Sequence, residues 1–147
     1  MGSKSCMPVT TEVRVRYAET DQMNVVYYAN YLVWFETGRT ELLRAAGLTY
    51  DRLEKEYGLI LPVAEARCRY RLPARYDDRI LIETRTSQVR GPLVKFAYRI
   101  FRANDPGSPE RELLAEGETT HVVCDARMNR VRLPEPYAAA LKKMMEE

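Results

Sequence analysis

The segment that most restricts the possible folds is residues 29–46, where apolar side chains recur at helical spacing. Large apolar residues stand consecutively at positions 31–35, so the first half of this predicted helix is apolar around most of its circumference. Such a helix has to be covered by other parts of the molecule, so we expect it at the centre of the fold. Gly47 supplies a C-terminal stop. Gly38, which costs the helix up to roughly 1 kcal/mol, predicts that a neighbouring backbone passes close by.

The other segments mostly alternate between apolar and polar residues, which is the pattern of half-buried strands. They predict strands at 12–17, 59–72, 79–89, 94–100 and 112–125 with a short continuation at 131–133, a short helix at 49–57 and an amphipathic helix at 134–145. One long helix and one antiparallel sheet can bury each other only if the sheet curls around the helix. We therefore predict one α+β domain over residues 1–147, a curled antiparallel sheet around one long central helix, with a loose tail at about residues 1–8.

The composition excludes several classes of protein. A net charge of +2, with arginines interspersed among glutamates, gives no case for a protein that binds nucleic acid. No segment approaches the ~20 apolar residues of a membrane span, and nothing resembles a signal peptide. The three cysteines, Cys6, Cys68 and Cys124, are odd in number and lack the spacing of metal ligands. We expect reduced thiols, a cytoplasmic location and no metal site.

One carboxylate stands in the polar turn between the first predicted strand and the long helix. Asp21 precedes a helix whose first backbone N–H groups have no partner within the helix, and such groups can stabilise a negative charge that develops nearby. A carboxylate in this position can attack a carbonyl carbon or deprotonate a water molecule that attacks it. The sequence leaves both routes open, and it also leaves open that Asp21 only caps a turn.

The run Asp-Gln-Met-Asn-Val-Val-Tyr-Tyr-Ala-Asn-Tyr at residues 21–31 resembles the signature of the hot-dog-fold acyl-CoA thioesterases, in the branch with 4-hydroxybenzoyl-CoA thioesterase and the YbgC-type enzymes. The likeness extends to residues 35–41, 115–125 and 132–134, and the order of elements matches over about residues 10–145. The resemblance implies a homodimer or homotetramer with sheets joined edge to edge and active sites between subunits. It also implies an acyl-CoA or acyl carrier protein thioester as substrate, with no cofactor other than the coenzyme A of the substrate.

Carried over to this sequence, the resemblance assigns the catalytic carboxylate to Asp21 and the oxyanion hole to the backbone N–H of Tyr28. Many YbgC-type members have His where this chain has Tyr28, whereas the 4-hydroxybenzoyl-CoA branch has Tyr. If the backbone amide does the work, activity survives this change; if an imidazole assists in those relatives, Tyr28 removes that assistance and shifts the rate or the substrate preference. Asn30 either orients the Asp21 loop or is an ordinary polar residue of the first helical turn. The acyl group itself, whether aryl, short-chain or medium-chain, stays open.

Substrate contacts are predicted at two further places. Arg90 and Lys95 flank the Gly91-Pro92 turn and could meet the phosphates of coenzyme A, although they could equally be solvated charges. Leu61 and Val63, taken from a partner strand, are expected to line the acyl pocket.

Three more polar residues are interpreted as structural. We expect Glu36 to pair with an arginine, His121 to be a satisfied histidine of the core or an interface, and Asp125 to end its strand by bonding the following turn. Two rival functions remain. A dehydratase or hydratase of the same fold is disfavoured because no Asp-x-Asn-Pro-x-His pattern is present, and a non-catalytic acyl-CoA-binding protein would not need Asp21 beside a helix start.

Overall fold

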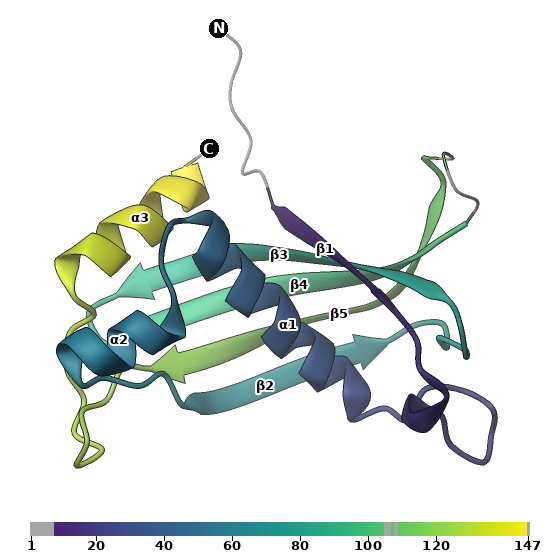
Figure 1. Ribbon diagram of the computed structural model, residues 1–147, viewed down its shortest axis with the longest axis horizontal. Coiled ribbons are helices and arrows are strands. Elements are labelled where there is room, and N and C mark those ends of the chain that lie inside the picture. The colour runs from purple at the N-terminus through teal and green to yellow at the C-terminus, as the bar shows by residue number, and fades with distance from the viewer. Residues whose placement is uncertain (1–7, 105–106, 108, 147) are drawn as a thin grey trace, which may run out of the picture.

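A single antiparallel sheet of five strands curls around one long helix, α1 (Asn30–Ala45), which lies across one face of the sheet (Figure 1). The computed structural model describes residues 8–104, 107 and 109–146. The strands are β1 (Val9–Arg14), β2 (Val63–Tyr70), β3 (Arg79–Arg90), β4 (Leu93–Ala103) and β5 (Arg111–Val122), in the order β1-β3-β4-β5-β2. The predicted fold class is confirmed. The tail expected at residues 1–8 lies outside the described residues except for Pro8.

The core forms between α1 and the inner face of the sheet. Trp34, Phe35, Leu42 and Leu43 of α1 are buried, and the ring of Phe35 stacks on that of Tyr98 with centroids 4.2 Å apart. The expectation that the helix is covered on nearly all sides is not met within one chain. Leu32 and Val33 are 39% and 49% exposed, because α1 has the sheet on only one side.

The close approach predicted at Gly38 is present, but it involves side chains rather than backbone. A Cβ added at Gly38 would lie 2.7 Å from Cγ2 of Ile82 and closer still to Oγ1 of Thr84, both on β3. The absence of a side chain therefore lets α1 settle onto β3.

Two shorter helices cover the end of the sheet that holds the β3–β4 hairpin (Figure 1). Helix α2 (Tyr50–Tyr57) is capped by the hydroxyl of Thr49, which accepts from the N–H of Arg52 at 3.0 Å, and ends at Gly58 in the left-handed region. Helix α3 (Glu135–Glu146) buries the side chains of Tyr137 and Leu141, as its predicted amphipathic stripe requires.

Several predicted strand limits are wrong. The first strand ends at Arg14 instead of residue 17, because the chain turns into a short 3-10 helix, η1 (Tyr17–Glu19), and leaves Tyr17 77% exposed. Strand β2 spans only part of the predicted 59–72. Residues 131–133 form no strand: beyond β5, Cys124 forms isolated bridges with Ile60 and with Arg130.

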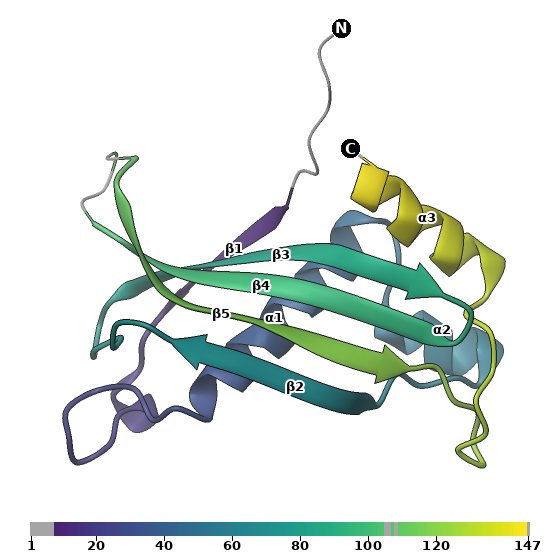
Figure 2. The same cartoon turned by 180° about the vertical axis from the view of Figure 1, so that it is seen from behind.

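Among the described residues, no helix lies on the opposite face of the sheet (Figure 2). Strand β2 lies at one edge, bonded only to β5, and all its residues except the half-buried Cys68 are exposed. The described residues include no helix long and apolar enough to cross a membrane.

Candidate active site

Asp21 lies in a tight turn between η1 and α1. Its N–H donates to the carbonyl of Val25 at 2.9 Å, and its carbonyl accepts from the N–H of Asn24, which has a φ of +66°. One carboxylate oxygen, Oδ1, accepts from the N–H of Met23 at 2.9 Å. The turn-capping geometry is therefore present, but Oδ2 accepts no hydrogen bond from the part of the chain that the structure describes. Half of the carboxylate is thus held in place while the other half is free to react.

A pocket of about 290 Å³ opens beside this carboxylate. Its wall is largely aromatic and apolar: besides Asp21 it includes Val26, Tyr28, Tyr31, Tyr70 and Leu72. The start of α1 lies beside the C-terminal end of β2 (Figure 1), and residues at both places line the pocket. A carboxylate on an apolar wall suits an apolar group held next to a nucleophile or base.

The start of α1 leaves backbone donors next to this pocket. Ala29 is the N-cap and provides no side-chain cap, and the N–H groups of Tyr28 and Ala29 donate to no acceptor among the described residues. The following amides of Asn30 and Tyr31 donate to the carbonyls of Tyr27 and Tyr28. Two free amides at a helix start can stabilise a negatively charged oxygen.

The loop between η1 and α1 holds Asp21 and is called the Asp21 loop below. Asn30 closes its base. Its Nδ2 donates to the carbonyl of Glu19 at 2.9 Å, and the same carbonyl accepts from the N–H of Tyr27 at 2.8 Å. Glu19 is also bonded through its buried carboxylate, which accepts from the N–H of Arg16. The two ends of the loop are thus tied to one point, an arrangement that fits the alternative in which Asn30 orients Asp21.

Tyr70 is a residue of this site that the sequence reading missed. Its hydroxyl donates to the carbonyl of Tyr28 at 3.0 Å, and its ring stands perpendicular to those of Tyr28 and Tyr31. Burial raises the pKa of the Tyr70 hydroxyl, so it stays a neutral donor across the physiological range. Alternation along the strand predicts which face Tyr70 takes, but nothing local predicts a partner that is 42 positions away in the chain.

The segment after β2 supports the same loop. The N–H of Ala74 donates to the hydroxyl oxygen of Tyr31 at 3.1 Å, and the carbonyl of Ala74 accepts from the N–H of Val26 at 2.8 Å. The loop is therefore attached to both α1 and the end of β2.

The predicted substrate-binding residues do not join this site within one chain. Arg90 and Lys95 lie by the β3–β4 hairpin, at the end of the sheet opposite the Asp21 loop (Figure 1). Leu61 and Val63 lie at the start of β2, whereas Tyr70 at its other end lines the pocket. Seven strand steps of ~3.3 Å separate Val63 from Tyr70, about 23 Å.

His121 is completely buried, as predicted for a satisfied core histidine. Its Nε2 bonds the hydroxyl of Thr119 at 2.8 Å and its Nδ1 bonds the carbonyl of Leu61 at 3.1 Å. Burial lowers the pKa of His121 to about 4, so the ring is neutral near pH 7. His121 also does not line the pocket at Asp21, so it is not placed beside that carboxylate as the histidine of a dehydratase would be.

The other two structural predictions have opposite outcomes. Oδ1 of Asp125 accepts from the N–H groups of Arg127 and Asn129, both at 2.9 Å, which confirms its role in the turn. The prediction that Glu36 pairs with an arginine is wrong: Glu36 is exposed and forms no ion pair among the described residues, because it points away from the sheet that carries most arginines. No group of side chains in the described ranges could hold a metal ion.

A sheet that curls around one helix, with a carboxylate in the turn just before that helix, is the arrangement of the hot-dog thioesterases. The structure superposes on the hypothetical protein TT1821 from Thermus thermophilus with a TM-score of 0.82 at 36% identity, covering 92% of this chain and 98% of that one. A 4-hydroxybenzoyl-CoA thioesterase bound to 4-hydroxybenzoyl-CoA superposes equally well, with a TM-score of 0.82, and its 20% identity supports the fold alone.

Comparison with other sequences identifies the family of this chain. Residues 15–141 match the model of the thioesterase-like superfamily. A putative acyl-CoA thioesterase, YneP of Bacillus subtilis, is 37% identical over 78% of each chain. The acyl-CoA thioesterase YbgC of Haemophilus influenzae is 35% identical over 87% of this chain and 90% of its own length. The chain belongs to the thioesterase-like superfamily, and its enzyme class is that of the thioester hydrolases.

Proposed function

We propose that this chain hydrolyses acyl-CoA thioesters to a free acid and coenzyme A, with Asp21 and the backbone amide of Tyr28 as its catalytic groups. The observation that carries the proposal is that Asp21, with one oxygen free, and Tyr28, with a free N–H, line the same apolar pocket. The relatives named acyl-CoA thioesterases support the substrate. Acyl carrier protein remains the alternative carrier of the acyl group.

The chemistry divides into attack and stabilisation. Asp21 either attacks the thioester carbon to give a mixed anhydride, which water then hydrolyses, or removes a proton from a water molecule that attacks instead. In both routes the carbonyl oxygen becomes an oxyanion, and the amides of Tyr28 and Ala29 donate to it, a contribution of ~3–4 kcal/mol in comparable sites. The thiolate leaves without a strong general acid, so neither His121 nor a cofactor is required.

Tyr70 acts on this oxyanion hole through the peptide between Tyr28 and Ala29. The carbonyl of that peptide accepts from the Tyr70 hydroxyl and from the N–H of Tyr31, and its own N–H belongs to Ala29. Hydrogen bonds to a carbonyl polarise the whole peptide and strengthen its N–H as a donor. Tyr70 is therefore a positioning residue, since it acts through the backbone without needing to touch the substrate.

The complete site includes a second subunit in this proposal. The free edge of β2 can pair with the same edge of another copy, and a two-fold axis makes that pairing antiparallel. Antiparallel pairing brings the Val63 end of the partner's β2 towards the Tyr70 end of this one. The predicted role of Leu61 and Val63 in lining the acyl pocket thus belongs to the partner subunit in a homodimer or homotetramer.

The free thiols of Cys68 and Cys124 support a cytoplasmic location, where thiols stay reduced.

A panel of coenzyme A thioesters with short, medium and aromatic acyl groups tests the activity and defines the substrate, with thiol release as the measured signal. We expect hydrolysis of at least one member of the panel. Tight binding of the panel without any thiol release would instead favour the non-catalytic acyl-CoA-binding protein.

A further inference from the structure

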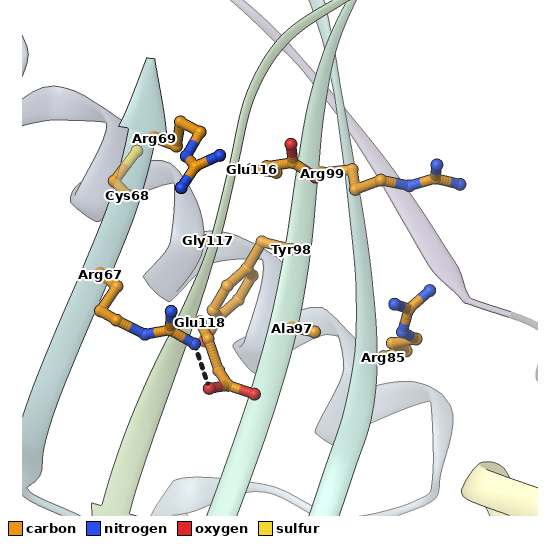
Figure 3. Close-up of a pocket in the computed structure, with 10 residues that line it drawn as sticks. All are labelled: Arg67, Cys68, Arg69, Arg85, Ala97, Tyr98, Arg99, Glu116, Gly117 and Glu118. Carbon is orange, nitrogen blue, oxygen red and sulfur yellow. Dashed lines mark hydrogen bonds and ion pairs between the residues drawn. The ribbon is translucent and has the colours of Figure 1, made fainter. Parts of the chain in front are cut away.

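The outer face of the sheet, opposite α1, holds a hollow of about 580 Å³ (Figure 3). Its centre is open because Ala97 of β4 places only a methyl group there, between the longer side chains of the neighbouring rows. No helix covers this face in the part of the chain that the structure describes (Figure 2). The hollow is larger than the pocket at Asp21 and differs from it in chemistry.

Four arginines and two glutamates line the hollow: Arg67 and Arg69 of β2, Arg85 of β3, Arg99 of β4, and Glu116 and Glu118 of β5. Strand register explains this grouping. One row across the sheet contains Arg67, Glu118, Ala97 and Arg85, and the next contains Arg69, Glu116 and Arg99.

Both glutamates already have cationic partners. Glu118 accepts from Arg67 at 2.8 Å and from the hydroxyl of Ser87, and Glu116 accepts from Nε of Arg71 at 2.8 Å. The hydrogen bond from Arg71 lowers the pKa of Glu116, and the one from Arg67 lowers the pKa of Glu118, so both are ionised at neutral pH. Their negative charge is therefore already balanced by these arginines.

Not every arginine of the hollow is paired with a carboxylate. Arg99 pairs with Glu83 at 2.9 Å, but Arg69 and Arg85 form no ion pair within the described residues. Four positive charges against two negative ones leave a surplus of two within the lining. Lys95, whose charge also lowers the pKa of Glu118, adds a further cation nearby.

We propose that this hollow binds the phosphate-bearing nucleotide end of a coenzyme A thioester whose acyl end lies at Asp21, an inference that rests on the proposed function. Arg71 connects the two places, since it lines the Asp21 pocket and bonds Glu116, which lines the hollow. Guanidinium groups are the preferred donors to phosphate oxygens. A second copy of the same face would fit poorly, because the uncompensated arginines of the two copies would face each other.

A substrate without phosphates separates this proposal from catalysis itself. The same acyl group can be presented on coenzyme A or on N-acetylcysteamine, which keeps the thioester and lacks the nucleotide. For the double variant R69Q/R85Q we expect KM for the coenzyme A ester to rise about tenfold or more, with kcat little changed, because charge-assisted hydrogen bonds are lost. With the N-acetylcysteamine ester, kcat and KM should be the same for the variant and the native chain. The control R127Q removes an exposed arginine that does not line the hollow and should match the native chain on both substrates.

Ionic strength and direct binding give independent readouts. Added salt should raise KM of the native chain for the coenzyme A ester. It should thereby reduce the difference in KM between the native chain and R69Q/R85Q. Calorimetry should show weaker binding of free coenzyme A to the double variant, whether or not the protein hydrolyses any ester.

Equal KM values and equal coenzyme A binding in native and R69Q/R85Q proteins would overturn the proposal while leaving the thioesterase function intact. A changed oligomeric mass in the variant together with unchanged coenzyme A binding would also overturn it, because the face would then be an interface between copies. Weaker coenzyme A binding by the variant, with no hydrolysis of either ester by the native chain, would support the binding site and reject the proposed function.

Discussion

At the scale of single residues, the hydroxyl of Tyr70 is the group whose removal isolates one contribution to the proposed oxyanion hole. Tyr70→Phe keeps the ring contacts with Tyr28 and Tyr31 but removes the hydrogen bond to the Tyr28 carbonyl. Since one such bond contributes about 1 kcal/mol, we expect kcat to fall several-fold with KM little changed. Steady-state kinetics measures this, with Tyr76→Phe, an exposed tyrosine outside the pocket, as the control. A rise in KM at constant kcat would contradict a role in the transition state.

His121 makes a prediction about pH. Its pKa is lowered from 6.5 to about 4 by burial, so between these values the unfolded chain binds a proton that the folded chain does not. The stability linked to this group is therefore complete above about pH 6.5 and is lost as the pH falls towards 4, by up to about 3 kcal/mol.

The chain has one histidine, so its imidazole can be followed by NMR without interference. Its resonances should not titrate between pH 8 and 5. A midpoint near 6.5 would mean that the ring is accessible to solvent and that the buried network with Thr119 is wrong.

At the scale of elements, the contact between α1 and β3 depends on Gly38. Alanine is the better helix former by up to about 1 kcal/mol, yet its Cβ would collide with Ile82 and Thr84 of β3. We expect Gly38→Ala to lower the free energy of unfolding by about 1–3 kcal/mol, the usual range for overpacking.

A second substitution checks this cause. The Thr84 hydroxyl is the nearest obstacle and has no hydrogen-bond partner among the residues that the structure describes, so Thr84→Ala removes it without breaking a bond seen there. Denaturant unfolding should show a smaller cost of Gly38→Ala in the Thr84→Ala background. Identical costs in both backgrounds would contradict the close contact.

Elements that depend on local chemistry could be predicted from the sequence, and those that depend on distant pairing could not. The predicted helix at 29–46 is observed at Asn30–Ala45, and the one predicted at 49–57 is observed at Tyr50–Tyr57 between the caps Thr49 and Gly58, because caps act within one turn. The end of β1 was missed because a change of direction at η1 leaves the alternating pattern intact.

The same distinction applies to the site. Asp21 and the free amides of the first turn are neighbours in sequence, so their proximity could be predicted. The hydrogen bond of Tyr70 and the grouping of Arg69 with Arg85 depend on strand order and register, which the sequence alone does not specify. Arg90 and Lys95 were chosen for their charge at a turn, but the order of strands places that turn far from Asp21.

At the scale of the whole molecule, the exposed edge of β2 predicts an assembly. Light scattering should give a mass of two or four times the 17.1 kDa of one chain. Val63 is 47% exposed in the single chain, so Val63→Asp should not unfold it but would place a charge in the proposed interface. We expect this variant to dissociate more readily than Met128→Asp, which alters another exposed apolar side chain that lies outside β2. A monomeric native protein would contradict the proposed assembly.

The central claim is that Asp21 carries the reaction, and Asp21→Asn tests it most directly. An asparagine Oδ1 can still accept from the N–H of Met23, so the turn should persist while the negative charge is removed. On the best coenzyme A thioester of the panel, we expect the variant to bind substrate with similar affinity and to lose at least about a hundredfold in kcat. Equal rates of hydrolysis by the native chain and by the variant would contradict the mechanism.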